Sequence, residues 1–269
     1  MIVSTLSFTL MNAFVKQLSH YPTFEIVFFR AIGSLILATI YIISKGIPIL
    51  GNSHKLLIMR ALSGLAAMSL FFMSLQYLPV GTAVSIRYLA PIYAAIFASI
   101  ILKEKLLPIQ WLLFLFAFSG VLVLKGFDHD LDSTGLLLVL SASVFSGLVY
   151  VLIRKIGKKD HPMIVVNYFM FISTIVSGIL SYNVWIQPTG FDWLLLLSLG
   201  IFGFFGQVFM TIAFQIAKTN LVAPLKYIEV LFTILIGVTW FGDLYSIWSL
   251  MGILMIIAAL VANVIIGKR

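Results

Sequence analysis

Residues 22–44 read PTFEIVFFRAIGSLILATIYIIS, and Glu25 and Arg30 are the only charged side chains in this run of 23 residues. About 20 mostly apolar residues suffice for a helix to cross a bilayer. Across all 269 residues, 62% are hydrophobic, 10% are charged and the mean hydropathy is +1.14. A water-soluble fold of this size does not hide so much apolar surface. This composition excludes a soluble enzyme, a disordered chain and, with no cysteine, a disulfide scaffold.

The chain contains ten segments of this kind, which predict an all-α integral membrane protein with ten transmembrane helices. The runs are too long and too uniformly apolar for the alternating strands of a barrel. The predicted spans are residues 1–18, 22–44, 57–78, 80–102, 108–125, 133–154, 162–183, 191–217, 220–241 and 246–266.

Basic residues gather in alternate connections, which sets the orientation. With the N-terminus in the cytoplasm, eleven lysines and arginines lie inside and two, Lys16 and Lys125, lie outside. The positive-inside rule then predicts a multi-pass protein of the cytoplasmic (inner) membrane with both termini inside. We interpret the net charge of +8 as attraction to anionic lipid of the bilayer, with no nucleic-acid partner.

The two halves of the sequence align at a constant offset of 139 residues. Gly64 then meets Gly203, and Gln76 meets Gln215. We expect two five-helix units, residues 1–125 and 133–267, joined by a linker at 126–132. An odd number of helices per unit inserts the second unit upside down, and such inverted repeats bind substrate near the midplane between them.

Four ionisable residues lie well inside predicted spans: Arg30, Arg87, Lys226 and Glu229. Intramembrane charges are functional candidates because burial in lipid is costly. Lys226 and Glu229 share one helix face. With Arg87 they would give a cavity of net positive charge, which favours a carboxylate, a phosphate or a zwitterion. The alternative is a structural Lys226–Glu229 pair, with Arg87 snorkelling outward.

Other residues near these charges receive weaker predictions. Arg30 is a candidate for substrate contact. Glu25, near the outer surface, is expected to be solvated, and Arg60 is expected to snorkel to lipid phosphate at the cytoplasmic end of its span. Tyr88 and Tyr227 occur at the same place in both halves and are candidate substrate contacts.

Further candidates follow from aromatic and proline positions. Prolines inside spans free a carbonyl and permit a bend, which often lines a cavity. Pro91 and Pro224 are the two such prolines near the charges. The aromatic side chains that can line the same cavity are Phe71, Phe72, Tyr93 and Tyr168.

The sequence carries no motif of catalysis or metal binding. The four histidines fall in connections between spans, and there is no metalloprotease, nucleotide-binding or serine-nucleophile motif. We therefore expect no enzyme activity, no catalytic residue, no metal site and no cofactor.

Several stretches of the sequence together form a recognisable pattern: residues 22–30, Arg60, 78–83, Pro91, 103–105 and Gly120-Val121. With them the chain resembles the EamA-type ten-helix branch of the drug/metabolite transporter superfamily. The stretch 223–229 and the Phe-Glu-Ile-Val-Phe-Phe-Arg run look most like S-adenosylmethionine or similar metabolite carriers. This resemblance implies a basket of ten helices, a central cavity from the third, fourth, eighth and ninth spans, and rocking helix pairs. Asp243, at the end of the ninth span, departs from the glutamate that is commoner there.

We expect a secondary active transporter of a small polar metabolite, anionic or zwitterionic, that works by alternating access with Glu229 as a protonatable coupling group. An uncoupled facilitator, a lipid flippase and a membrane receptor or scaffold are the alternatives. The sequence leaves open whether protons or a counter-substrate are coupled, which substrate moves in which direction, and whether the chain is a monomer or a homodimer.

Overall fold

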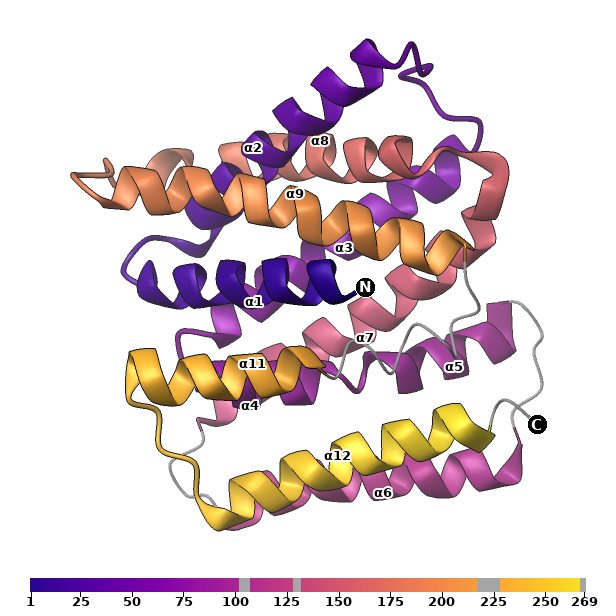
Figure 1. Cartoon of the computed structure of the whole chain (residues 1–269), viewed down its shortest axis with the longest axis vertical. Coiled ribbons are helices and arrows are strands. Elements are labelled where there is room, and N and C mark those ends of the chain that lie inside the picture. Colours follow the sequence, from indigo (N-terminus) through magenta and orange to yellow (C-terminus); the bar gives the residue numbers. More distant parts are fainter. Residues whose placement is uncertain (102–106, 128–131, 217–227, 267–269) are drawn as a thin grey trace.

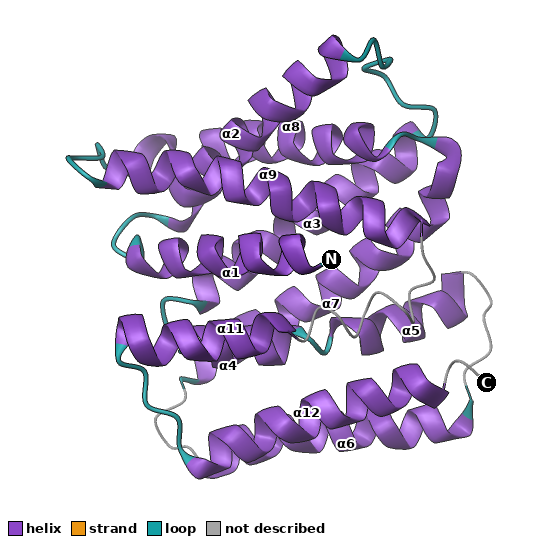
Figure 2. Cartoon of the chain, viewed as in Figure 1, coloured by secondary structure: helices purple, strands orange, loops and turns teal. Residues whose placement is uncertain are grey.

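The computed structural model describes residues 1–101, 107–127, 132–216 and 228–266. In these ranges the chain consists of helices and connections, without a strand (Figure 2). The helices are α1 (Ile2–Gln17), α2 (Thr23–Ser44), α3 (His54–Ser74), α4 (Val80–Arg87), α5 (Ala90–Ile101), α6 (Pro108–Phe127), α7 (Ser133–Ile156), α8 (Pro162–Ser181), α9 (Asp192–Ile216), α11 (Ile228–Ile236) and α12 (Ile247–Ile266), with the short turns η1 (Gly157–Lys159) and η2 (Tyr182–Val184) and the π-helical η4 (Gly237–Phe241).

Six helical segments within the described ranges are long and apolar enough to cross a membrane. They coincide with α2, α3, α4 with α5, α7, α8 and α9. Shorter apolar helices lie at Pro108–Val123, Glu229–Phe241 and Ile247–Asn263. The chain is thus an all-α membrane protein, and the count of ten spans stays a prediction.

The predicted fourth span is interrupted in its interior. α4 ends at Arg87 and α5 begins at Ala90, so two residues break the helix just before Pro91. A proline has no N–H to continue the helical hydrogen bonds, which explains the position of the break. The interruption places Tyr88 at a corner inside the helical layer, where its side chain is buried.

The helices form a stack of antiparallel neighbours (Figure 1). α6 and α12 pack along each other at one end of the molecule, and α2, α8 and α9 lie at the other. Between these ends, α3 packs on α7 and α1 packs on α9. The centre of the stack is therefore surrounded by α1, α3, α7 and α9.

Two glycines allow α2 and α9 to touch backbone to backbone. A Cβ added at Gly33 would lie 2.8 Å from the Cα of Gly200, and a Cβ at Gly200 would lie 2.6 Å from the Cα of Gly33. No side chain fits at that separation. Ser34 adds a hydrogen bond from its hydroxyl to the carbonyl of Gly200 at 2.8 Å. Small residues at such crossings are typical of membrane helices.

Charged side chains form hydrogen bonds with backbone groups at both ends of α3. Asp160 is buried and accepts hydrogen bonds from the backbone N–H groups of Asn52 and Ser53, before the first turn of α3. At the other end, the ammonium of Lys16 donates to the carbonyl of Leu75 at 2.6 Å. Both contacts satisfy backbone groups that a helix terminus leaves without a partner.

Candidate functional site

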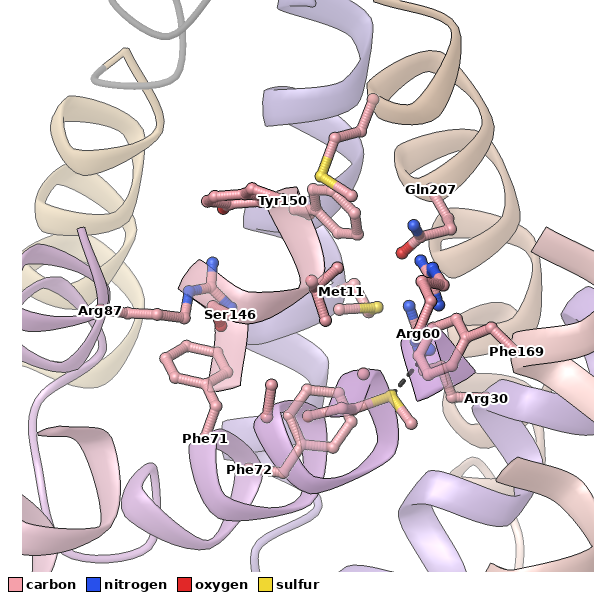
Figure 3. A pocket seen from close by; sticks show the side chains of 16 residues that line it. Met11, Arg30, Arg60, Phe71, Phe72, Arg87, Ser146, Tyr150, Phe169 and Gln207 are labelled. Carbon is pink, nitrogen blue, oxygen red and sulfur yellow. Dashed lines mark hydrogen bonds between the residues drawn. The ribbon is translucent and has the colours of Figure 1, made fainter. Parts of the chain in front are cut away.

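A cavity of about 100 Å³ lies at the centre of the stack (Figure 3). Water occupies about 30 Å³ per molecule in the liquid, so the cavity has room for a few waters or for the charged end of a small solute. Its described walls come from α1, α2, α3, α4, α7, α8 and α9. The resemblance implied a cavity from the third, fourth, eighth and ninth spans; the first three of these contribute, and other helices contribute as well.

Three arginine side chains line this cavity, and its described lining contains no aspartate or glutamate. Arg30, Arg60, Phe169 and Gln207 gather on one side, whereas Arg87 and Phe71 lie on the other (Figure 3). The cavity therefore has one side with the two arginines Arg30 and Arg60 and an opposite side with the single arginine Arg87.

Glu229 lies behind the Arg87 side and is the centre of a hydrogen-bond network. Its side chain is fully buried, and its two oxygens accept three hydrogen bonds. Arg87 Nη2 donates at 2.9 Å, Tyr88 Oη donates at 2.7 Å and Asn12 Nδ2 donates at 3.2 Å. The network joins α1, the α4–α5 break and α11.

Arg87 connects this network to the cavity. Its guanidinium carbon lies 3.8 Å from the centroid of the Phe71 ring, a cation–π contact, while its Nη2 pairs with Glu229. The side chain of Arg87 is 21% exposed, against 0% for Glu229. Arg87 thus has one partner away from the cavity and remains accessible from it.

Arg30 and Arg60 are buried on the opposite side of the cavity, with relative exposures of 3% and 1%. Their guanidinium carbons lie 5.4 Å and 4.2 Å from the centroid of the same Phe169 ring. Arg30 Nη1 is 2.7 Å from the sulfur of Met68. Among the residues that the structure describes, neither arginine forms a salt bridge.

The expectation for Arg60 is wrong, because its side chain does not reach the lipid surface. The guanidinium turns inward beside Gly64, where an added Cβ would stand 3.0 Å from Arg60 Nη1. The expectation that Glu25 is solvated is also wrong. Glu25 is fully buried and its Oε2 accepts the backbone N–H of Ile186 at 3.0 Å. Depth in a span was known from the sequence, but the buried face of each helix was not.

The remaining predicted site residues divide into three groups. Tyr88 joins the Glu229 network, and Phe71 and Phe72 line the cavity. Tyr93 and Tyr168 belong to other contacts: Tyr93 packs against an aromatic ring of α6, and the Tyr168 hydroxyl is 2.9 Å from an imidazole nitrogen at the start of α3.

Lys226, Tyr227 and Pro224 lie outside the described residues, so the pairing of Lys226 with Glu229 stays a prediction. Asn12 is a partner of Glu229 that sequence reasoning missed. Its signal was an amide among the apolar and hydroxylated residues 2–15 of the first span. No group of three or more potential metal ligands occurs in the part of the chain that the structure describes.

Long apolar helices around a small, positively lined cavity define a multi-pass membrane protein with an internal polar site. Comparison with known proteins shows the family to which it belongs. The chain belongs to the EamA-like transporter family, whose sequence model matches residues 1–125 and again residues 133–265.

Relatives of known name are transporters of the drug/metabolite superfamily. The chain is 28% identical over 267 residues to the pseudopaline exporter CntI of Pseudomonas aeruginosa, covering 97% of this chain and 93% of that protein. It is 27% identical to the S-adenosylmethionine uptake transporter of Rickettsia prowazekii, covering 88% and 81%. It is 27% identical to human solute carrier family 35 member G1, covering 96% and 76%.

One chain of a solved crystal structure has the same fold. Its TM-score is 0.71 at 18% sequence identity, and the match covers 99% of both chains. The fold is thus shared along the whole length. The family and the named relatives are membrane transporters, which supports a transport role for this protein.

Proposed function

We propose that this protein is a secondary active transporter of a small anionic or zwitterionic metabolite across the cytoplasmic membrane. The observation that carries the proposal is the sign of the cavity. Three arginines line it, the described lining contains no carboxylate, and Glu229, behind Arg87, is already paired with that arginine. A buried cavity of net positive charge favours a ligand with a carboxylate or phosphate group.

The proposal includes ten spans arranged as two inverted units, residues 1–125 and 133–267, with a linker at 126–132. The offset of 139 residues carries α2 onto α8, α3 onto α9 and α6 onto α12. The packing supports this correspondence because contacts occur in mated pairs. The contact of α1 with α9 has its mate in α7 with α3, and that of α2 with α9 has its mate in α8 with α3.

Alternating access follows from such a pair of units, because exchanging their conformations exposes one central site to each side in turn. In the proposed orientation both termini lie in the cytoplasm, as the distribution of basic residues indicates. The cavity between α1, α3, α7 and α9 is then the site that each side reaches in turn.

Glu229 is the proposed coupling group. Its protonation removes the charge that holds Arg87, which leaves Arg87 free to face the cavity and an anion bound there. Tyr88 and Asn12 keep the carboxyl in place in either protonation state, since both donate hydrogen bonds to it. Binding of an anion and of a proton would thereby favour each other.

The experiment begins with purified full-length protein and a thermal-shift screen of amino acids, dicarboxylates, nucleosides and S-adenosylmethionine. The compound that raises the melting temperature most becomes the probe, since a ligand of the folded state stabilises it. Counterflow of this probe in proteoliposomes then tests transport, and an imposed pH gradient tests coupling.

Glu229→Gln should retain counterflow and lose the response to the pH gradient, whereas Lys45→Gln, at an exposed lysine, should behave as wild type. Wild-type counterflow that ignores the gradient would indicate the uncoupled facilitator. Flip of a fluorescent phospholipid without movement of any soluble probe would indicate a flippase. Either result overturns the proposed coupling.

A further inference from the structure

The side of the cavity that bears Arg30 and Arg60 is too charged to be an apolar core, and its described residues supply no carboxylate to pair with the arginines. Three of the N–H-bearing nitrogens there, Arg30 Nε, Arg60 Nε and Arg60 Nη1, are buried and lack a hydrogen-bond partner among the residues that the structure describes. Both guanidinium carbons lie within 5.4 Å of the centroid of the Phe169 ring, so the two positive charges are near neighbours.

This arrangement is unfavourable unless something compensates it. Two like charges repel, and at low dielectric the repulsion is poorly screened. A buried charge without a partner is strongly destabilising in a protein. Sulfur atoms and the face of Phe169 are weak substitutes for a carboxylate. The energetically sufficient partner is a ligand that brings negative charge.

The fold nevertheless makes specific room for both guanidinium groups. A Cβ at Gly64 would lie 3.0 Å from Arg60 Nη1, and a Cβ at Gly203 would lie 3.1 Å from Arg30 Nε. These two glycines correspond to each other at the 139-residue offset. Each unit of the proposed repeat therefore supplies one glycine that admits one arginine to the cavity.

We propose that Arg30 and Arg60, which both contact the ring of Phe169, form a subsite for a doubly charged oxyanion, such as the phosphate of a phosphate monoester. The assignment rests on the proposed function and names its substrate class. Within the described ranges these two cations have no carboxylate partner, and two negative charges would neutralise them. The planar guanidinium fork also matches phosphate oxygens in bidentate contacts. Arg87 lies on the opposite side of the cavity (Figure 3), and its charge is already balanced by Glu229.

The cavity volume fits this assignment. About 100 Å³ holds a charged end group and a few waters, and it does not hold a whole nucleotide. The subsite would therefore bind the phosphate end of a solute. Phe72 and Met11, which line the same cavity, are placed to contact the rest of it.

Binding is tested with inorganic phosphate at pH 8, where it carries two charges. Purified full-length protein in neutral detergent is melted in phosphate, acetate or chloride at one ionic strength. We expect phosphate to raise the melting temperature saturably, by about 5 °C at a hundredfold excess over Kd. Acetate and chloride should give at most a small part of that shift.

Arginine variants assign the response to the subsite. Arg30→Gln and Arg60→Gln should each abolish the phosphate shift. Without phosphate they should melt at or above the wild-type temperature, because each substitution removes an unpaired buried charge. If an arginine instead stabilised the fold, its Gln variant would melt below the wild-type temperature without phosphate. Arg60→Lys keeps the charge, loses the bidentate fork and should weaken phosphate binding at least tenfold. Lys45→Gln removes an exposed charge and should leave the shift unchanged.

Phosphate groups also occur on lipids, so a second arm uses nanodiscs without free phosphate. The soluble-anion assignment predicts equal melting temperatures in phosphatidylcholine and phosphatidylglycerol. A stabilisation by phosphatidylglycerol that Arg60→Gln abolishes would overturn it in favour of a lipid headgroup. Equal shifts with phosphate and acetate, or a phosphate shift that survives both Gln variants, would overturn the subsite itself.

The test separates this proposal from the proposed transport function. An arginine-dependent phosphate shift in a protein that shows no counterflow leaves the subsite standing and refutes transport. Counterflow with an unchanged KM in Arg30→Gln and Arg60→Gln leaves transport standing and refutes the subsite.

Discussion

Removal of Arg87 should destabilise the protein more than removal of Glu229, although both break the same 2.9 Å ion pair. Glu229 is fully buried, so Arg87→Gln leaves a carboxylate without its counter-charge, which costs about 3–5 kcal/mol. Glu229→Gln leaves an arginine that is 21% exposed and still lies on the Phe71 ring. Its cost is that of one charge-assisted hydrogen bond, about 1.5–3 kcal/mol.

Unfolding of the single variants and of the double variant in the same detergent micelles measures these losses. The double variant should be less destabilised than the sum of the two single variants by about 2 kcal/mol, because the partners are in direct contact. Equal losses for the two single variants would refute the argument from burial. A strictly additive double variant would refute the pairing of the two side chains.

Three further predictions concern the frame and its ends. Gly200→Ala should cost about 1–3 kcal/mol of stability because its Cβ would stand 2.6 Å from the Gly33 Cα. Gly178→Ala faces only a phenylalanine ring at 3.3 Å and should be nearly neutral. Equal melting temperatures of the two variants would contradict the backbone contact of α2 with α9. Asp160→Ala should cost about 1.5–3 kcal/mol by leaving two backbone N–H groups before α3 without their acceptor, and faster hydrogen exchange confined to the start of α3 checks this. Burial raises the pKa of Asp243, in the connection before α12, so the stability that its proton contributes is complete below about pH 4 and is lost as the pH rises through the raised pKa. Melting temperatures measured against pH should therefore fall less steeply above pH 4 in Asp243→Asn than in wild type, and parallel curves would contradict the assignment.

Helix positions were predictable because the bilayer requires long apolar runs, and these runs are visible without tertiary information. The break before Pro91 was also predictable from local sequence, because a proline lacks the N–H that a continuous helix needs. The pairing of helices requires more. The contact of α3 with α7 depends on which face each helix presents, and an apolar helix in lipid has little amphipathic signal to reveal it.

In the candidate site, too, some residues were predictable from the sequence and others required the packing of the helices. Glu229 and Arg87 were predicted to share one central region because charges inside spans need partners, but the partner that the sequence indicated for Glu229 was Lys226 and not Arg87. Arg60 was not, because its place near a span end favoured the lipid surface and only Gly64 in the folded helix shows that the side chain turns inward. Asn12 was missed because an uncharged amide in a span gives a weak signal, although it donates to Glu229.

Under the proposed two-unit architecture, the frame repeats and Arg87 falls on Lys226, but the charges of Glu229, Arg30 and Arg60 do not repeat. The 139-residue offset places Ala90 opposite Glu229, Phe169 opposite Arg30 and Leu199 opposite Arg60. In that architecture, glycines and helix contacts that recur in both units would let the two units exchange conformations. The charges of Glu229, Arg30 and Arg60, which lack mates at this offset, would make the two exchanged states electrostatically different. A ligand or proton that changes this charge balance therefore shifts the population between the states, because only a difference in interaction free energy can move such an equilibrium.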